Sequence, residues 1–288
     1  MSFNSSEVST QDGRPAALYR LDWGNTSWFY TSADRKIERS EYVNGVLQTV
    51  SYEPRAMSDD GMVQGSSSQN DFTVNGPSDL PIVRLFRGTP PSETIWMTVR
   101  RCHDADGTEA PIYWTGTVSN LKRPTDAKCA IIGQPLSASL KRTGLRLCWT
   151  RECPHFLYDP GCKVDPEAYR VDGEVLALAG NSITVAAADT QESGWFRGGF
   201  VAWEANDDGT LERRFVEADT VTVDDDDVTV TILTIFGLVD FLEVGDTVRM
   251  YPGCSRVPTV CDGKFGNIDN YGGFDKMPGS SPFNTAIW

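Results

Sequence analysis

The sequence predicts a mainly β protein. Residues 41–50 hold two short apolar runs on either side of Asn44-Gly45, a dipeptide that favours a type I′ hairpin. Residues 94–99 and 112–118 are rich in β-branched and aromatic side chains, as strands usually are. No long stretch repeats its apolar residues every 3.6 positions, so we expect any helices to be short.

The length of 288 residues predicts two domains of ordinary size. We place an N-terminal β-barrel or β-sandwich domain at residues 1–140 and a turn-rich domain at 141–288. The second domain contains an inserted β module at 168–250, in which we expect 195–201 to form an aromatic-rich strand with a Gly-Gly bend. After residue 251, Gly, Pro, Asn and Asp dominate, so this segment needs something to fold around.

The composition narrows the classes of partner. The formal net charge is −14, and phosphate binding requires clustered Lys and Arg, so we expect neither nucleic-acid binding nor attachment to anionic membranes. Residues 1–13 are polar and lack the basic start and apolar run of a secretory signal. No stretch approaches the roughly 20 apolar residues of a membrane helix. We therefore expect synthesis in the cytosol and a soluble product.

Much of the negative charge is local. Residues 201–250 carry 13 acidic and 3 basic side chains, with four consecutive Asp at 224–227. A calcium loop spaces its carboxylates so that they converge, whereas these four are adjacent. The flanking alternating runs, 220–223 and 228–231, favour a solvated hairpin tip.

Four of the seven cysteines form two pairs that flank the inserted module. Cys153 and Cys162 precede it, and Cys254 and Cys261 follow it. Cys162 and Cys254 each follow Pro-Gly, a tight turn that can direct successive backbone N–H groups at an anionic centre. Disulfides are rare in the cytosol, where cysteines more often pack, bind metal or react.

The number of residues between the two cysteines of each pair helps to distinguish which metal centre they could bind. Structural zinc sites usually space paired ligands by two to four residues, and neither gap here is that short. Wider loops can surround a bulkier group, and four thiolates suit a [4Fe–4S] cluster. From spacing alone, zinc, two disulfides and unrelated buried thiols remain alternatives.

The other cysteines and the histidine between the first pair have weaker signals. Cys102 has no partner at a useful spacing. Cys129 and Cys148 lie in apolar stretches, which predicts a packing role, and Cys148 is also an alternative ligand because it is near the first pair. His155 could ligate, but a position at the surface or beside the ligands is favoured.

The cysteine segments resemble a known family. Residues 153–165, 251–261 and 264–279 are similar to the C-terminal domain of siphophage tail-tip hub proteins, which include the minor tail protein L of lambda-like phages and the hub proteins of gene transfer agents. The resemblance covers roughly residues 140–288. The first 135 residues share only β character and a loose Trp-Thr-Gly-Thr-Val pattern at 114–118.

The resemblance implies a structural role. The family's four cluster cysteines match Cys153, Cys162, Cys254 and Cys261 position by position, so it implies a structural [4Fe–4S] cluster on these residues. It implies a β-rich hub in the virion tail tip, assembled in the host cytoplasm as a homo-oligomer, commonly a trimer. The implied partners are the distal tail and tube proteins, the tape measure protein, and a central tip or fibre protein.

The sequence departs from the lambda-like members of this family at the inserted module. In lambda-like members the two cysteine pairs are close together, whereas here residues 168–250 separate them, as in the gene-transfer-agent branch. The module could be an outward arm or a surface for tip fibres. The apolar C-terminal residues 282–288 could dock on a neighbouring copy or pack on their own subunit.

Catalytic motifs are scarce, so we expect a protein that is not an enzyme. The sequence contains no Gly-x-Ser-x-Gly elbow, P-loop or His-Glu-x-x-His. His103-Asp104 is better explained as part of a polar turn, and Asp59-Asp60 as solvated carboxylates of an exposed loop at 53–70. The alternative functions are a tail-associated hydrolase acting on the host cell wall and a redox iron–sulfur protein.

Overall fold

The structure is a computed structural model that describes residues 7–8, 15–62, 71–103, 110–141, 144, 148–187, 191–206, 208–223 and 229–278. The expected polar turn at 104–107, the Asp run at 224–227 and the C-terminal segment 282–288 lie outside this range. The chain divides into two compact units, Met1–Arg142 with Ala205–Glu212, and Thr143–Glu204 with Arg213–Trp288. Both are built mainly of strands, so the mainly β prediction is confirmed.

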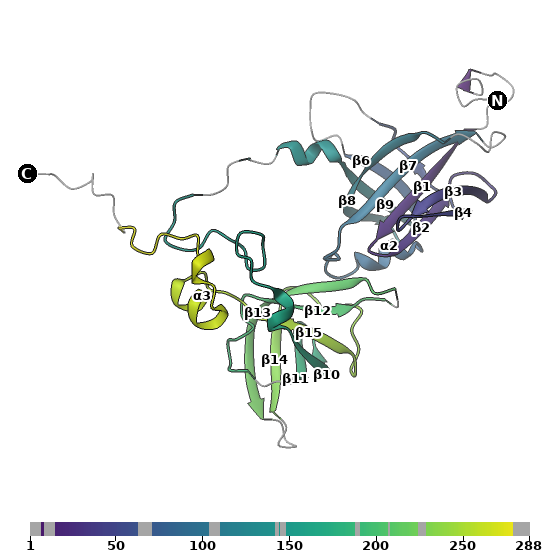
Figure 1. Ribbon diagram of the computed structural model, residues 1–288. Helices are drawn as coiled ribbons and strands as arrows, with labels where there is room; N and C mark the ends of the chain where they lie inside the picture. The colour runs from purple at the N-terminus through teal and green to yellow at the C-terminus, as the bar shows by residue number, and fades with distance from the viewer. Residues whose placement is uncertain are drawn as a thin grey trace, which may run out of the picture. The chain divides into compact units, whose positions relative to one another are not determined.

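The first unit contains one nine-stranded sheet in the order β3-β4-β2-β1-β7-β8-β9-β6-β5 (Figure 1). The described strand pairs are antiparallel except β2 with β4, which is parallel. Its strands are β1 Pro15–Trp23, β2 Thr26–Thr31, β3 Ile37–Val43, β4 Val46–Pro54, β5 Ser58–Asp59, β6 Phe72–Pro77, β7 Ile95–His103, β8 Ile112–Thr125 and β9 Lys128–Pro135. The unit also contains a short helix, α2 Pro81–Leu85, and a 3-10 turn, η1 Leu136–Lys141.

Both faces of this sheet are covered by apolar side chains. Successive residues of a strand point to opposite faces. Along β1, Leu18 therefore belongs to a small core with Tyr52 and Cys102, while the next residue, Tyr19, belongs to a larger core that includes Val99. The first unit thus has a core on each face of its sheet.

The β3–β4 hairpin is the one predicted from Asn44-Gly45. Val43 pairs with Val46, and Asn44 and Gly45 have φ angles of 50° and 79°. A type I′ turn requires positive φ at both central positions, which Asn and Gly tolerate best.

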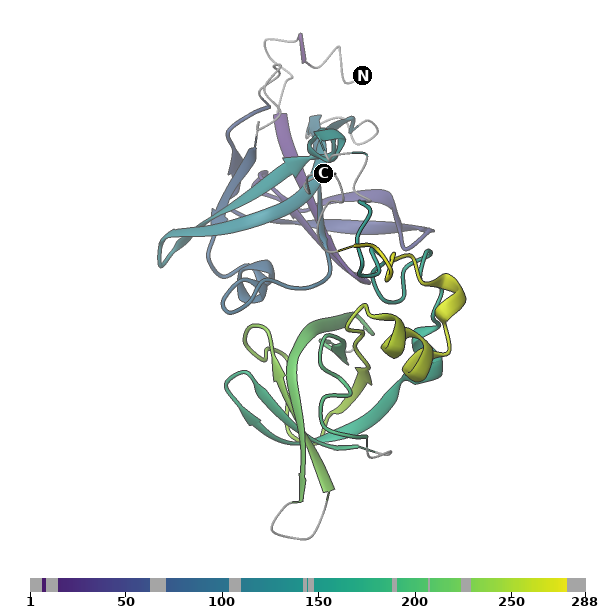
Figure 2. The ribbon, with the colours of Figure 1, turned by 90° about the vertical axis from the view of Figure 1, so that its left-hand side faces the viewer.

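The second unit contains a closed barrel, in the order β10-β11-β14-β13-β12-β15. Its strands lie between Val171 and Tyr251. Figures 1 and 2 show helix α3 at one end of the barrel, next to the segment that carries the first cysteine pair. The elements are η2 Pro166–Tyr169, β10 Val171–Ala179, β11 Ser182–Ala187, β12 Phe200–Glu204, β13 Leu211–Val223, β14 Thr229–Ile235, β15 Thr247–Tyr251, α3 Pro258–Phe265 and η3 Ile268–Asn270.

The barrel has its own core. Alternate residues of each strand point inward, and buried side chains such as Val175, Val216 and Val248 fill the interior around Trp203. Strands β13 and β14 pair up to Val223 and Thr229, so they flank the Asp run as expected for a hairpin.

Two sequence expectations need correction. Residues 195–199 are turns, and strand β12 begins only at Phe200. The reason is close backbone approach: a Cβ on Gly199 would lie 2.0 Å from the carbonyl oxygen of Tyr251. The loop expected at 53–70 contains the end of β4 and the short β5, and 63–70 lie outside the described residues.

The segment after Tyr251 is also more regular than its composition suggests. Helix α3 begins at Pro258, whose fixed φ suits a first helical position, and ends before Gly266, which has a φ of 57°. Among the described residues, no helix is long and apolar enough to cross a membrane.

Candidate metal centre

Barrel closure brings the two cysteine pairs together. Strands β10 and β15 are antiparallel neighbours, and Val171 at the start of β10 lies opposite Met250 near the end of β15. The chain therefore enters and leaves the barrel at the same place. The first pair lies before the entry and the second after the exit, so both pairs reach one end of the barrel.

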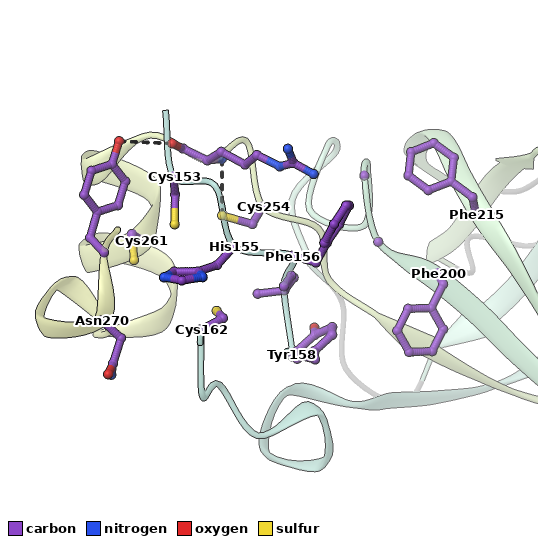
Figure 3. Close-up of a pocket in the computed structure, with 15 residues that line it drawn as sticks. Cys153, His155, Phe156, Tyr158, Cys162, Phe200, Phe215, Cys254, Cys261 and Asn270 are labelled. Atoms are coloured by element: carbon purple, nitrogen blue, oxygen red, sulfur yellow. Dashed lines mark hydrogen bonds between the residues drawn. The ribbon is translucent and has the colours of Figure 1, made fainter. Parts of the chain in front are cut away.

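The four cysteines line one cavity of about 330 Å³. Figure 3 shows their sulfur atoms around a common space, into which the ring of His155 also projects. Cys153, Cys162 and Cys261 are buried, and Cys254 is half-buried. The site residues expected from the sequence are thus brought together within the second unit.

Asp159 shapes the loop between the first two cysteines. Its Oδ1 accepts a hydrogen bond from the N–H of Cys162 at 2.6 Å, and its Oδ2 accepts one from the N–H of Phe156 at 3.0 Å. Burial alone would raise the pKa of Asp159, but these backbone hydrogen bonds keep it below its usual value. The N–H of Cys162 is therefore directed at a carboxylate and not at a sulfur.

Three of the four sulfurs face N–H donors from elsewhere. The N–H of Gly272 lies 3.5 Å from Cys153 Sγ, and the N–H of Arg256 lies 3.3 Å from Cys254 Sγ. The Asn267 side-chain amide lies 3.7 Å from Cys162 Sγ. Such donors stabilise negative charge on sulfur. Sequence reasoning missed all three, although they lie in the segments that carry the family resemblance.

The fourth thiol is coupled to the other three. Cys261 Sγ faces the carbonyl oxygen of Asn267 at 3.2 Å. Burial, and then the nearby thiols of Cys254, Cys153 and Cys162, raise the pKa of Cys261 to about 11. The other three thiols thus oppose the ionisation of Cys261, and a bound cationic centre would offset that repulsion.

The sulfurs border a cavity and do not meet at one point. Zinc sites place four ligands about 2.3 Å from a single ion when they are thiolates. Within the described part of the chain, no group of three or more His, Cys, Asp or Glu side chains is arranged to hold a metal ion. The four cysteines thus line a cavity without converging on one ion position.

Backbone contacts join the two cysteine segments. The N–H of Cys153 donates to the carbonyl oxygen of Arg256 at 3.0 Å, and the N–H of Phe274 donates to that of Thr150 at 2.8 Å. The Tyr271 hydroxyl bonds to the carbonyl oxygens of Arg151 and Arg256 at 2.7 and 3.2 Å. The segment before the barrel and the tail after it therefore form one structure.

Lys264 connects helix α3 to the barrel through hydrogen bonds and a cation–π contact. Its ammonium donates to the carbonyl oxygens of Trp195 and Gly253 and lies 4.2 Å from the centre of the Trp195 ring. Burial lowers the pKa of Lys264 to about 8. Beside it, Phe265 packs edge-on against Tyr169, with ring centres 5.1 Å apart. These contacts fix the helix that carries Cys261.

The remaining three cysteines differ in burial. Cys102 and Cys129 are buried in the two cores of the first unit, and the packing role predicted for Cys129 is confirmed. The same prediction was wrong for Cys148, which is exposed. Its neighbour Trp149 stacks on Phe274 with ring centres 4.6 Å apart and stays 75% exposed, so the apolar run does not enter a core. Cys148 and Cys153 line a second pocket together.

The acidic and histidine side chains of the first unit form structural contacts. Asp59 binds Arg101 at 2.5 Å and accepts the Tyr19 hydroxyl at 2.7 Å. His103 is buried on β7, and its Nε2 lies 2.8 Å from a carboxylate oxygen of Glu7.

Three comparisons relate the chain to known proteins. The family model described as "Phage conserved hypothetical protein BR0599" matches residues 194–281, which include Cys254, Cys261 and helix α3. No curated protein matches the sequence significantly. One chain of the virion of a native gene transfer agent (GTA) particle is 20% identical with a TM-score of 0.77, and the match covers 100% of this chain and 96% of that one. Along its whole length, the protein therefore has the fold of a gene-transfer-agent virion chain.

Proposed function

We propose that the protein is a structural component of a phage-like virion, a tail-tip hub whose second unit is held together by a [4Fe–4S] cluster on Cys153, Cys162, Cys254 and Cys261. The arrangement of these four cysteines around one cavity carries the proposal. The whole-chain similarity to a virion protein supports it, as does the family match over the second cysteine pair.

The cavity residues fit such a group. Three sulfurs face N–H donors, as is common around iron–sulfur clusters, whose properties depend on hydrogen bonds to sulfur. When bound, the cluster would supply iron–thiolate bonds that cross-link the segments before and after the barrel. The chain itself supplies the turn fixed by Asp159, the anchoring of α3 by Lys264 and the burial that limits access of water.

A structural role for the cluster follows from what surrounds it. Outside the barrel, the apolar core of this region is small and centres on Cys162, Val164 and Phe265. Short segments with so little apolar burial gain much of their stability from metal cross-links. A cluster at this position would hold the tail against the barrel.

The hydrolase alternative finds little support in the first unit. A glycosidase uses two carboxyl groups on opposite sides of a bond. Asp59 is held by Arg101 and Tyr19, and Asp60 accepts a hydrogen bond from the Asn75 side-chain amide at 3.1 Å. Both carboxylates have structural partners, which favours a non-enzymatic protein.

We place the protein in the virion tail tip, as a homo-oligomer and most simply a trimer. Its partners there would be the distal tail and tube proteins, the tape measure protein, and a central tip or fibre protein. In a cyclic arrangement every copy uses the same pair of surfaces.

Electron microscopy of assembled particles tests this role. We expect three copies of the chain in a ring at the distal end of the tail. Density for the chain in the capsid, along the tube, or as one copy per tip would contradict the hub role.

A further inference from the structure

We propose that His155 is a positioning residue that sets the spacing between the two cysteine-bearing segments. It does so as a spacer held between Gly161 and Gly272. The role of His155 in holding a cluster depends on the proposed function. The contacts of His155 with the two segments do not depend on it.

The two nitrogen atoms of the imidazole face the two glycines. A Cβ added to Gly161 would lie 2.4 Å from His155 Nδ1, and one added to Gly272 would lie 2.6 Å from Nε2. Real Cβ atoms essentially never come this close to another heavy atom. A side chain at either position would therefore require the ring of His155 to shift.

The ring borders the cavity that the four cysteines line, and its other neighbours limit where it can shift. Motion away from Gly272 brings it against Gly161, and the Cβ position of Gly272 also lies 3.2 Å from Pro154 Cδ. In addition, Asp159 Oδ2 lies 4.0 Å from Nδ1. Figure 3 shows the ring among the four sulfur atoms, so any shift would move it relative to them.

Each glycine is directly linked to one cysteine. Gly161 precedes Cys162 in the chain, and the N–H of Gly272 faces Cys153 Sγ at 3.5 Å. The width of the imidazole therefore determines how far the tail stands from the first cysteine pair. Because each ring nitrogen lies beside the Cβ position of one glycine, we assign His155 as a spacer and not as a metal ligand.

Substitutions at the glycines and at His155 test this role together. We expect Gly161→Ala and Gly272→Ala each to speed the release of iron to a ferrous chelator about tenfold or more, as changes beside metal ligands often do. They should also speed protease cleavage within residues 266–278. Adding His155→Ala removes the clash, so each double variant should release iron and be cleaved no faster than His155→Ala alone.

Two nearby glycines provide matched controls. A Cβ on Gly273 would meet backbone atoms, including the Arg151 carbonyl oxygen at 2.6 Å, so Gly273→Ala should add to the defect of His155→Ala. A Cβ on Gly263, in helix α3, meets nothing within 4 Å, so Gly263→Ala should behave as wild type.

A second substitution at His155 separates the effect of the ring's shape from the effect of its nitrogen atoms. His155→Phe keeps a planar ring of similar width and should retain iron, whereas His155→Ala should release iron faster. If His155→Phe loses iron as His155→Ala does, the nitrogen atoms matter and the spacer role is wrong.

The experiments give different results if the cluster proposal is wrong and if the spacer role of His155 is wrong. If the wild-type protein contains no iron, the cluster proposal fails, and cleavage within 266–278 still reports on the spacer. If both glycine variants resist protease as wild type does, or if either double variant is cleaved faster than His155→Ala alone, the spacer role is overturned whatever the iron content.

Discussion

The side chain of Asn267 contacts Cys162 of the first cysteine pair. Its Nδ2 donates to the Cys162 carbonyl oxygen at 2.6 Å and lies 3.7 Å from the Cys162 sulfur. The carbonyl oxygen of the same residue lies 3.2 Å from Cys261 Sγ. One residue of the tail thus touches one cysteine of each pair.

Asn267→Asp should weaken the site. The substitution keeps the shape of the side chain but replaces the N–H donor with a negative charge beside a thiolate, which is unfavourable. We expect iron content to fall and protease cleavage within 266–278 to rise. Asn181→Asp, in the barrel, makes the same chemical change away from the cysteines and should retain iron. Equal iron content in the two variants would contradict the role of Asn267.

Lys264→Met should loosen helix α3. The methionine side chain has a similar reach but cannot donate to the Trp195 and Gly253 carbonyl oxygens. Hydrogen bonds from a charged donor contribute about 1.5–3 kcal/mol each, so we expect urea unfolding to show a loss of about 2 kcal/mol or more. Lys276→Met changes an exposed lysine of the tail and serves as the control. A variant at Lys264 as stable as this control would show that the helix is held by other contacts.

The first unit should lose stability in acid partly through Asp59. Burial would raise the pKa of Asp59, but hydrogen bonds from Arg101 and Tyr19 and the charge of Arg101 outweigh it and lower the pKa below its usual value. A carboxylate with a lowered folded-state pKa adds stability above its unfolded pKa, and this contribution disappears as the pH falls through the folded value.

Asp59→Asn removes that charge. We expect the variant to be about 2 kcal/mol less stable at neutral pH, and the difference from wild type to shrink as the pH falls below the usual range of Asp. Urea unfolding as a function of pH measures both. Asp60→Asn, at an exposed neighbour, should follow the wild-type curve, and a pH-independent difference for Asp59→Asn would contradict the assignment.

Local rules explain which parts of the fold were predictable. The Asn44-Gly45 hairpin depends on two adjacent residues whose φ preferences select one turn. Helix α3 was not predicted because its apolar residues follow no helical period, and its ends are set by Pro258 and Gly266. The turn at 195–199 depends on contact with Tyr251, which lies far away in sequence.

Part of the candidate site was also predictable from local sequence, and part was not. The cysteine pairs were visible as spacing and as Pro-Gly-Cys turns, but the N–H donors were not. Gly272 and Asn267 reach the sulfurs only because the tail folds back onto the first pair. Cys148 was misassigned because an apolar neighbourhood in sequence does not guarantee burial, as Trp149 shows.

The cluster itself is tested most directly by the iron and acid-labile sulfide content of protein purified without oxygen. We predict about four iron and four sulfide per chain for wild type, as a [4Fe–4S] cluster requires, and for the control variant Cys148→Ser. Cys254→Ser should lose most of both. Wild-type protein with one zinc ion and no sulfide, or full iron in Cys254→Ser, would contradict a cluster held by these four cysteines.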